Sequence, residues 1–253
     1  MKKMILALAA VCLIWPALVQ ADEFQVAVAA NFTEPSKAIA AEFEKETGHK
    51  ATLIFGPTGG FETQVRQGAP FDVLLAANTK TPKNLEGDGL IKPGSRFTYA
   101  QGALALWSAQ EGLVDDQGNI LKSDKFKFLA VADPDLAPYG KAAYDVLKAW
   151  SLLEPLEKAK KIVTGNDIGK TFQLIDSGNA EIGFIAWSQV CREGKLSKGS
   201  VWQVPANLYS PIVQDAVILK GAADKAAVQA FADYLKNSPK AREIILSFGY
   251  TLP

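Results

Sequence analysis

Apolar positions along the chain follow two alternating spacings, one typical of strands and one typical of helices. Mostly apolar runs predict buried strands at residues 24–29, 52–55, 71–76, 128–132, 161–163 and 180–186. Apolar residues three and four positions apart predict helices at residues 35–46, 61–67, 141–150, 168–176, 226–235 and 241–248. Strands that alternate with helices favour a parallel sheet covered on both faces. The pattern therefore predicts the α/β class.

This alternation occurs twice, which predicts two lobes. Extended segments are expected at residues 97–107 and 208–219, and two helices follow the second of them. A late strand and helices after a complete second unit indicate that the chain returns to finish the first lobe. We predict lobe 1 at residues 22–99 and 212–253 and lobe 2 at residues 100–211, each a mostly parallel sheet flanked by helices. Two crossover segments would join the lobes, with a cleft between them.

The first 21 residues have the pattern of an export signal. A short basic start precedes an apolar run at residues 4–18, and small residues end the segment at Ala21, where cleavage is expected. The run is too short for a membrane span. We therefore predict a cleaved signal peptide at residues 1–21 and a periplasmic location, and we leave lipidation of Cys12 open.

Composition narrows the class of ligand. Lys plus Arg and Asp plus Glu number 27 each, so no overall charge favours nucleic acid. His49 is the single histidine, which excludes zinc sites built from several histidines, and we expect neither a cofactor nor a protein-bound metal ion. After the leader, Cys191 is the one remaining cysteine and cannot form an internal disulfide. The apolar residues 185–187 before it predict a buried thiol.

Four strand-to-helix turns carry the residues that point to a function. They lie at residues 29–33, 56–60, 133–140 and 165–169. The first turn of a helix has N–H groups without an internal partner, and the helix dipole adds partial positive charge, so each turn favours an anion. Ligands of open α/β sheets gather at the carboxyl ends of strands, where these turns lie. The turns therefore predict a cage of neutral donors for a tetrahedral oxyanion.

Two short polar side chains in these turns, Asn31 and Thr58, add an amide and a hydroxyl donor. Helix capping alone would also explain both residues. The glycines at residues 56–60 lack the Lys-Ser/Thr of a nucleotide-binding loop, so a tight turn is the plain alternative there. Asp133 and Asp167 are the nearby carboxylates, and both have positions typical of a turn or a helix cap.

Five segments give the chain a resemblance to a known family. They are residues 28–32, 56–60, 68–73, 133–140 and 208–213, and the resemblance extends over the whole mature chain in the same order. Here the chain resembles the periplasmic molybdate-binding proteins of ABC transporters, within the two-lobe extracellular oxyanion-binding proteins. The resemblance implies a two-lobe periplasmic binding protein, not an enzyme. It would capture molybdate and tungstate, deliver them to an ABC permease in the inner membrane, act as a monomer and bind no nucleic acid.

The resemblance also assigns contacts with the oxygens of the anion. Asn31 would supply its main-chain N–H and its side-chain amide. Thr58, where the family commonly has serine, would supply its hydroxyl and its N–H. Tyr139 and Ile168 would each donate a main-chain N–H from the second lobe.

Departures from the family pattern bear on which anion is bound. The first turn has Ala30-Asn31 instead of Ala-Ser or Thr-Asn, and Pro57 stands where serine is common, so both turns offer fewer donors. Molybdate and tungstate are fully deprotonated near neutral pH and need donors alone. Phosphate keeps a proton there and needs an acceptor, whereas sulfate differs from molybdate in size only.

Two further functions stay open. A receptor for an organic acid would hold a carboxylate with arginine, but among the arginines only Arg66 lies near a turn, and it is expected to face solvent. An exported hydrolase would need a nucleophile, a base and an orienting group. His49 lies in a polar turn and no Gly-x-Ser-x-Gly elbow occurs, although paired carboxylates leave this class possible.

Overall fold

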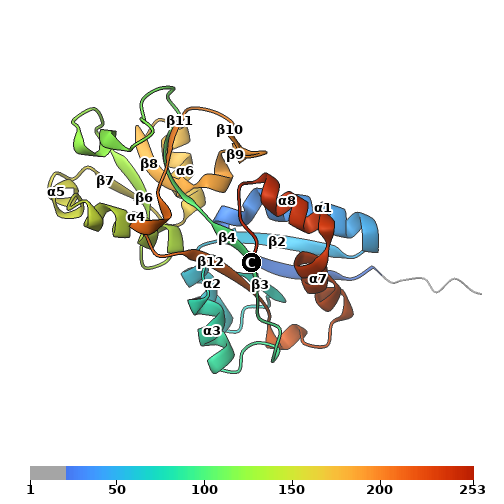
Figure 1. Ribbon diagram of the computed structural model, residues 1–253. Helices are drawn as coiled ribbons and strands as arrows, with labels where there is room; N and C mark the ends of the chain where they lie inside the picture. Colours follow the sequence, from blue (N-terminus) through green and yellow to red (C-terminus); the bar gives the residue numbers. More distant parts are fainter. Residues whose placement is uncertain (1–20) are drawn as a thin grey trace, which may run out of the picture.

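The computed structural model describes residues 21–253, so nearly all of the predicted signal peptide, with Cys12, lies outside the described residues. The described chain forms two lobes side by side, each built on a five-stranded sheet with helices packed against it (Figure 1). Strands β4 (Phe97–Gly102) and β12 (Ile212–Ile218) lie where the chain passes between the lobes. The predicted two-lobe α/β class is confirmed.

The first lobe is assembled from the two ends of the described chain. Its elements are β1 (Glu23–Ala29), α1 (Thr33–Thr47), β2 (Lys50–Gly56), α2 (Thr58–Arg66), β3 (Val73–Leu75), α3 (Lys80–Gly87), β4, β12, α7 (Ala226–Asn237) and α8 (Pro239–Ser247). The strand order is β2-β1-β3-β12-β4. Because successive side chains of β1 point to opposite faces, Phe24 and Val26 pack under α1, α7 and α8, while Ala27 packs under α2 and α3. Both faces of the sheet are therefore buried.

The second lobe is one continuous stretch of chain. Its main elements are β5 (Leu104–Ser108), β6 (Leu129–Ala132), α4 (Pro138–Ala149), α5 (Leu153–Lys158), β7 (Ile162–Gly165), α6 (Ile168–Asp176), β8 (Ile182–Ala186) and β11 (Ser200–Gln203). The strand order is β11-β5-β8-β6-β7. Helices α4 and α5 cover one face, and α6 covers the other, where Ile175 packs with Trp107.

Each sheet is mixed, whereas mostly parallel sheets were predicted. β1 runs parallel to β2 and β3, and β6 runs parallel to β7 and β8. The strands next to the crossings, β4, β5, β11 and β12, pair antiparallel. Residues 97–107, predicted as one extended segment, divide into β4 and β5, which belong to different sheets. The division into lobes at residues 99 and 211 stays our proposal.

Four helices begin earlier than predicted, and two of these early starts place site residues. Helix α2 begins at Thr58 and α4 at Pro138, three residues before the predicted starts in each case. Proline is favoured at the first helical position because its fixed φ suits the helix and its missing N–H would have no acceptor there. Thr58 and Tyr139 therefore lie in the first turns of their helices.

Smaller elements complete the described chain. They are β9 (Cys191–Arg192), which pairs with β10 (Lys195–Leu196), and the 3-10 helices η1 (Ala30–Phe32), η2 (Asn119–Lys122), η3 (Trp187–Gln189), η4 (Ala206–Leu208) and η5 (Lys220–Ala222). The Cys191 thiol is buried, as predicted, and burial raises its pKa. Within residues 21–253 no helix has the length and apolar character needed to cross a bilayer.

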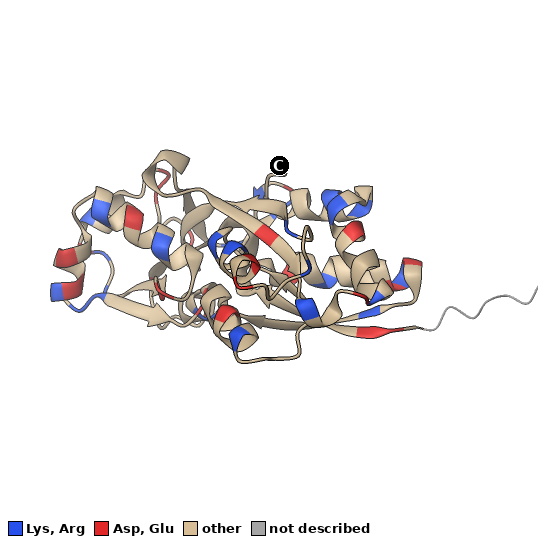
Figure 2. Cartoon of the chain, turned by 90° about the horizontal axis from the view of Figure 1, so that it is seen from below, with Lys and Arg blue, Asp and Glu red and all other residues tan. Residues whose placement is uncertain are grey.

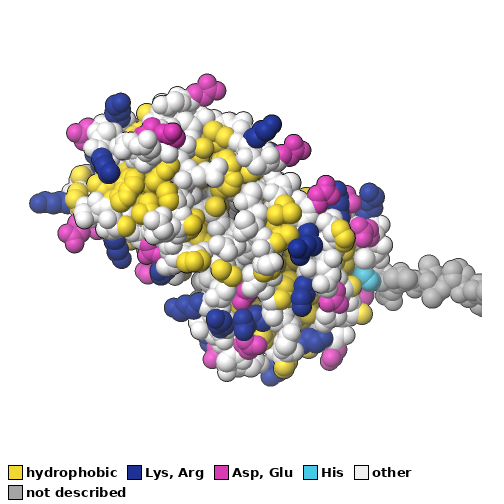
Figure 3. Space-filling model, in the orientation of Figure 1, with side chains coloured by type: hydrophobic (Ala, Val, Ile, Leu, Met, Phe, Trp, Pro, Cys, Tyr) yellow, Lys and Arg dark blue, Asp and Glu magenta, His cyan; other side chains and the backbone are white. Residues whose placement is uncertain are grey.

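Charged residues of both signs are spread over the two lobes. Figure 2 shows Lys and Arg interspersed with Asp and Glu along the ribbon, and Figure 3 shows the same mixture around apolar side chains on one face. Among the described residues no group of His, Cys, Asp and Glu side chains could hold a metal ion.

Candidate functional site

Four helix starts meet at one small cavity between the lobes. Helices η1 and α2 reach it from the first lobe, and α4 and α6 reach it from the second. The structure therefore brings all four predicted site residues together, and we call this cavity the donor cage. It is lined by Ala29, Ala30, Asn31, Gly56, Pro57, Thr58, Ala77, Ala137, Pro138, Tyr139, Asp167 and Ile168.

The donors of the cage are main-chain N–H groups. Asn31, Thr58, Tyr139 and Ile168 each lie in the first turn of a helix, where an N–H has no intrahelical acceptor. None of these N–H groups donates to another group of the described chain. The partial positive ends of the helices meet at the cage, and within the described residues no Lys, Arg or His lines it. The arrangement suits an anion without a cationic side chain.

The Thr58 side chain adds one oriented hydroxyl. Its Oγ1 accepts a hydrogen bond from the N–H of Ala77 at 3.0 Å, and the residue is 1% exposed. Because the oxygen accepts that bond, the single hydroxyl proton remains for a ligand. Pro57 is the N-cap of α2 and no side chain caps this helix, so capping does not explain Thr58.

The Asn31 side chain does not point its donors at the cage. Nδ2 donates to Gln214 Oε1 at 2.8 Å and to the Tyr250 hydroxyl at 2.9 Å, which uses both amide protons. No side chain caps η1 or α1, so the capping explanation fails here too. The main-chain N–H is therefore the donor that Asn31 offers to the cage, in place of the expected N–H and amide together.

The two aspartates near the turns have structural partners. Asp167 Oδ1 accepts the N–H of Lys170 at 2.8 Å and caps α6, and Asp133 Oδ1 accepts the N–H of Asp135 at 2.9 Å. The predicted cap and turn are confirmed. Asp167 is the one carboxylate among the described residues that line the cage, and it is bonded to its own helix.

Tyr139 contributes its main chain to the cage and its side chain to the crossing between the lobes. The hydroxyl is buried, has no hydrogen-bond partner among the described residues, and lies where a side chain on Gly102 would collide with it. Desolvation raises the pKa of this hydroxyl well above its ordinary value. It therefore stays neutral at physiological pH.

The Tyr139→Phe variant is expected to bind as the parent protein does and to be more stable by about 1 kcal/mol, because a buried hydroxyl without a partner is removed while the main-chain N–H stays. Calorimetry with the anion and denaturant unfolding measure the two quantities. A tenfold loss of affinity would show that the hydroxyl itself contacts the ligand.

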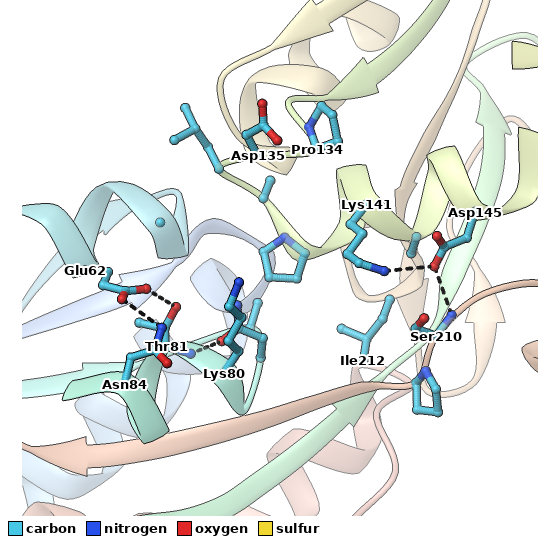
Figure 4. Close-up of a pocket in the computed structure, with 18 residues that line it drawn as sticks. Glu62, Lys80, Thr81, Asn84, Pro134, Asp135, Lys141, Asp145, Ser210 and Ile212 are labelled. Atoms are coloured by element: carbon cyan, nitrogen blue, oxygen red, sulfur yellow. Dashed lines mark hydrogen bonds and ion pairs between the residues drawn. The ribbon is translucent and has the colours of Figure 1, made fainter. Parts of the chain in front are cut away.

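A larger cavity of about 390 Å³ adjoins the cage between the lobes and shares Ala77, Ala137 and Pro138 with it (Figure 4). Its polar groups largely pair with one another. Lys141 and the N–H of Ser210 both bind Asp145 Oδ2, at 3.4 Å and 3.2 Å. Among the described residues no arginine lines the cavity, so it lacks the bidentate clamp that favours an organic acid.

Glu62, which lines the larger cavity, and Arg66, which pairs with it, bear on whether an organic acid could bind. Glu62 accepts hydrogen bonds from Thr81 at 2.8 Å and Asn84 at 3.1 Å (Figure 4). Arg66 pairs with Glu62 at 3.0 Å and with Asp88 at 2.5 Å, and it does not line the cage. The expected exposure of Arg66 is confirmed, with 41% of its side chain exposed.

The lobes are in direct contact on either side of the cage. The N–H of Gly59 in α2 donates to the carbonyl oxygen of Leu136 at 3.0 Å. The Ser188 hydroxyl in η3 donates to the carbonyl oxygen of Asn31 at 3.0 Å. These bonds show that the two lobes are closed against each other around the cage.

Three buried tyrosines, Tyr99, Tyr139 and Tyr250, surround the Gln214 side chain and the Asn31 amide. Burial raises the pKa of each, and that of Tyr250 reaches about 12. Sequence reasoning did not find this group, since Gln214 and Tyr250 carry no motif and lie far from Asn31 along the chain.

Alkaline destabilisation is expected from these tyrosines. The folded pKa of Tyr250 lies above the unfolded value near 10, so its stabilising contribution is complete below pH 10 and is lost as the pH rises towards 12. The free energy of unfolding should fall by about 1.4 kcal/mol per pH unit for each such tyrosine in that window. Denaturant unfolding at pH 8, 10 and 11 measures it. The slope should be shallower in Tyr250→Phe, and an equal slope would contradict the assignment.

Two lobes that close over a small site of unpaired donors have the architecture of a two-lobed binding protein. Residues 24–251 match the family model described as bacterial extracellular solute-binding protein, and the chain belongs to this family.

Curated relatives and solved structures agree with this membership. The molybdate-binding protein ModA of Azotobacter vinelandii is 55% identical over 233 residues, which cover 92% of this chain and 91% of the relative. ModA of Rhodobacter capsulatus is 50% identical over 231 residues, 91% of this chain and 88% of the relative. The structure of the Azotobacter vinelandii periplasmic molybdate-binding protein superimposes with a TM-score of 0.88 at 42% identity, covering 91% of this chain and 99% of that one. The resemblance seen in the sequence is confirmed.

Proposed function

We propose that the protein is a periplasmic solute-binding protein that captures molybdate in the donor cage and delivers it to an ABC permease. The observation that carries the proposal is the meeting of four helix starts, with unpaired N–H groups, at a cavity that has no cationic lining among the described residues. The relatives named as molybdate-binding proteins support the choice of ligand.

Each predicted site residue has a separate role in this proposal. Asn31, Tyr139 and Ile168 donate main-chain N–H groups to the oxygens of the anion. Thr58 donates its N–H and its hydroxyl, which Ala77 orients. A hydrogen bond to a charged acceptor contributes about 1.5–3 kcal/mol, so a few such donors suffice for tight binding.

Selectivity between oxyanions would follow from a cage that offers hydrogen-bond donors. Molybdate and tungstate carry no proton near neutral pH and match a cage of donors, so we propose that both bind. A phosphate that keeps its proton would need an acceptor, and we propose that the one carboxylate among the described lining residues, Asp167, serves as the cap of α6 through Oδ1 and not as that acceptor. Sulfate also needs donors alone, so the size of the closed cage would separate it from molybdate.

Location and partners complete the proposal. The leader at residues 1–21 directs the chain to the periplasm, where it acts as a monomer and docks on the permease of the inner membrane. We propose a binding protein rather than an enzyme, because Thr58, the hydroxyl of the cage, is bonded to a main-chain N–H and not to a base. Lys plus Arg and Asp plus Glu number 27 each, and Figure 2 shows the two signs interspersed along the described chain, which does not favour nucleic acid as a partner.

Titration calorimetry of residues 22–253 tests the function. Molybdate and tungstate should bind tightly with one site per chain, and sulfate and phosphate should bind at least about a hundredfold more weakly. Absent molybdate binding, together with tight binding of phosphate or an organic acid, would refute the proposal.

A further inference from the structure

Ser188 connects the second lobe directly to a residue of the donor cage. It lies in η3, immediately after β8, and is 4% exposed. Its hydroxyl donates to the carbonyl oxygen of Asn31 at 3.0 Å, across the boundary between the lobes. Asn31 thus offers its N–H to the cage and its carbonyl oxygen to the opposite lobe.

Tyr250 completes a closed ring of hydrogen bonds around this contact. Asn31 Nδ2 donates to the Tyr250 hydroxyl at 2.9 Å, Tyr250 donates to Ser188 Oγ at 2.9 Å, and Ser188 donates back to Asn31. The Tyr250 hydroxyl also lies 2.8 Å from the carbonyl oxygen of Asn31. Every hydroxyl in the ring both donates and accepts, and the ring is buried, so its bonds strengthen one another.

The ring takes its members from both lobes. Asn31 and Tyr250 belong to the first lobe, where the Tyr250 ring packs against Phe32 with centroids 5.3 Å apart. Ser188 belongs to the second lobe and leaves the ring when the lobes separate. The open protein keeps the bond between Asn31 and Tyr250 but loses both bonds of Ser188.

We propose that Ser188 and Tyr250 act as a latch: they are positioning residues that hold the closed lobes together and fix the Asn31 peptide in the donor cage, and so set the rate at which the bound anion leaves. This inference rests on the proposed function. Neither residue lines the donor cage, so each acts through Asn31 and not through the ligand.

The latch predicts a specific change in kinetics. The open lobes receive the anion before the latch forms, so Ser188→Ala and Tyr250→Phe should leave the association rate constant nearly unchanged. The dissociation rate constant should rise about tenfold in each, because both variants lose the bond between Tyr250 and Ser188, which joins the two lobes. Both variants lose the bond between Tyr250 and Ser188, so their effects should be less than additive in the double variant.

Stopped-flow fluorescence with molybdate measures both rate constants, with Trp187, the neighbour of Ser188 in η3, as an internal reporter. Two matched variants serve as controls. Ser200→Ala removes a buried serine hydroxyl of the second lobe that bonds Gln110 and Val114, far from the latch. Tyr234→Phe removes a hydroxyl of the first lobe that bonds Glu46. Neither control should change dissociation.

The outcomes separate this inference from the proposed function. Faster dissociation in both latch variants, with unchanged association and parental rates in both controls, supports the latch. If the wild-type protein binds molybdate but Ser188→Ala and Tyr250→Phe release it no faster than the controls do, the latch is overturned and the proposed function stands. Wild-type protein that binds neither molybdate nor tungstate overturns the proposed function and the latch with it.

Discussion

Replacement of Gly59 by leucine is expected to weaken molybdate binding by about 10–100-fold while both lobes stay folded. Gly59 lies in the first turn of α2 and donates its N–H to Leu136 of the other lobe at 3.0 Å. A Cβ at this position would lie 3.2 Å from the Leu136 Cα and carbonyl oxygen, which are main-chain atoms and cannot turn aside. The rest of a leucine side chain would hold the lobes apart, at a cost of about 1–3 kcal/mol or more to closure.

The fold itself should tolerate this change. Glycine is a poor helix former, and its replacement inside a helix gains up to about 1 kcal/mol. Calorimetry measures the affinity, small-angle scattering with and without molybdate measures closure, and thermal unfolding measures stability. Gly87→Leu is the matched control, since Gly87 also lies in a helix of the first lobe but has open space around it. Parental affinity in Gly59→Leu would contradict closure at this contact.

The Thr58→Val variant should lose about 10–100-fold in affinity for molybdate. Valine has nearly the shape of threonine but lacks the hydroxyl, so one donor to a charged ligand, worth about 1.5–3 kcal/mol, is removed. The same change leaves the N–H of Ala77 buried without its acceptor, which should lower the free energy of unfolding by about 1–3 kcal/mol. Calorimetry and denaturant unfolding separate the two effects.

Thr58→Ser is the matched control, because it keeps the oxygen that accepts from Ala77 and the proton that faces the cage. It should retain affinity within about threefold. Equal affinities of Thr58→Val and Thr58→Ser for molybdate would show that the Thr58 hydroxyl does not contact the anion. The main-chain N–H groups would then be the donors of the site.

The positions of the site residues could be predicted because they depend on local chemistry. A strand that ends in Ala-Asn or Gly-Pro-Thr before a helix places free N–H groups at the carboxyl edge of a sheet, whatever the rest of the chain does. Pro138 likewise marks a helix start that puts Tyr139 in the first turn. These local signals sufficed for Asn31, Thr58, Tyr139 and Ile168.

The directions of the side chains could not be predicted in the same way. Asn31 bonds to Gln214 and Tyr250, which are 183 and 219 positions away in the sequence, and Ser188 reaches Asn31 over 157 positions. The first two partners are set by the assembly of the first lobe from distant parts of the chain, and Ser188 by contact between the lobes. None of them leaves a periodic or compositional signal. Short elements were missed for a related reason: α3 and α5 each contain a proline and are held in place mainly by packing.

The antiparallel direction of some strands could not be predicted from local sequence patterns either. An apolar run has the same appearance whichever direction its neighbour takes, so β12 could be recognised as a strand but its pairing with β3 and β4 could not. The direction follows from the route of the chain, which leaves the first lobe through β4 and returns through β12.

Tyr250 and Thr251 make contacts beside the crossing between the two lobes. Thr251 exchanges two main-chain hydrogen bonds with Gln101 beside the crossing, at 2.8 Å and 3.0 Å, and Tyr250 reaches Asn31. A polypeptide that stops a few residues short could still build nearly all of both sheets and would lack these contacts. Truncation before Tyr250 would therefore remove its bonds to Asn31 and Ser188 while every strand of the two five-stranded sheets stays in the sequence.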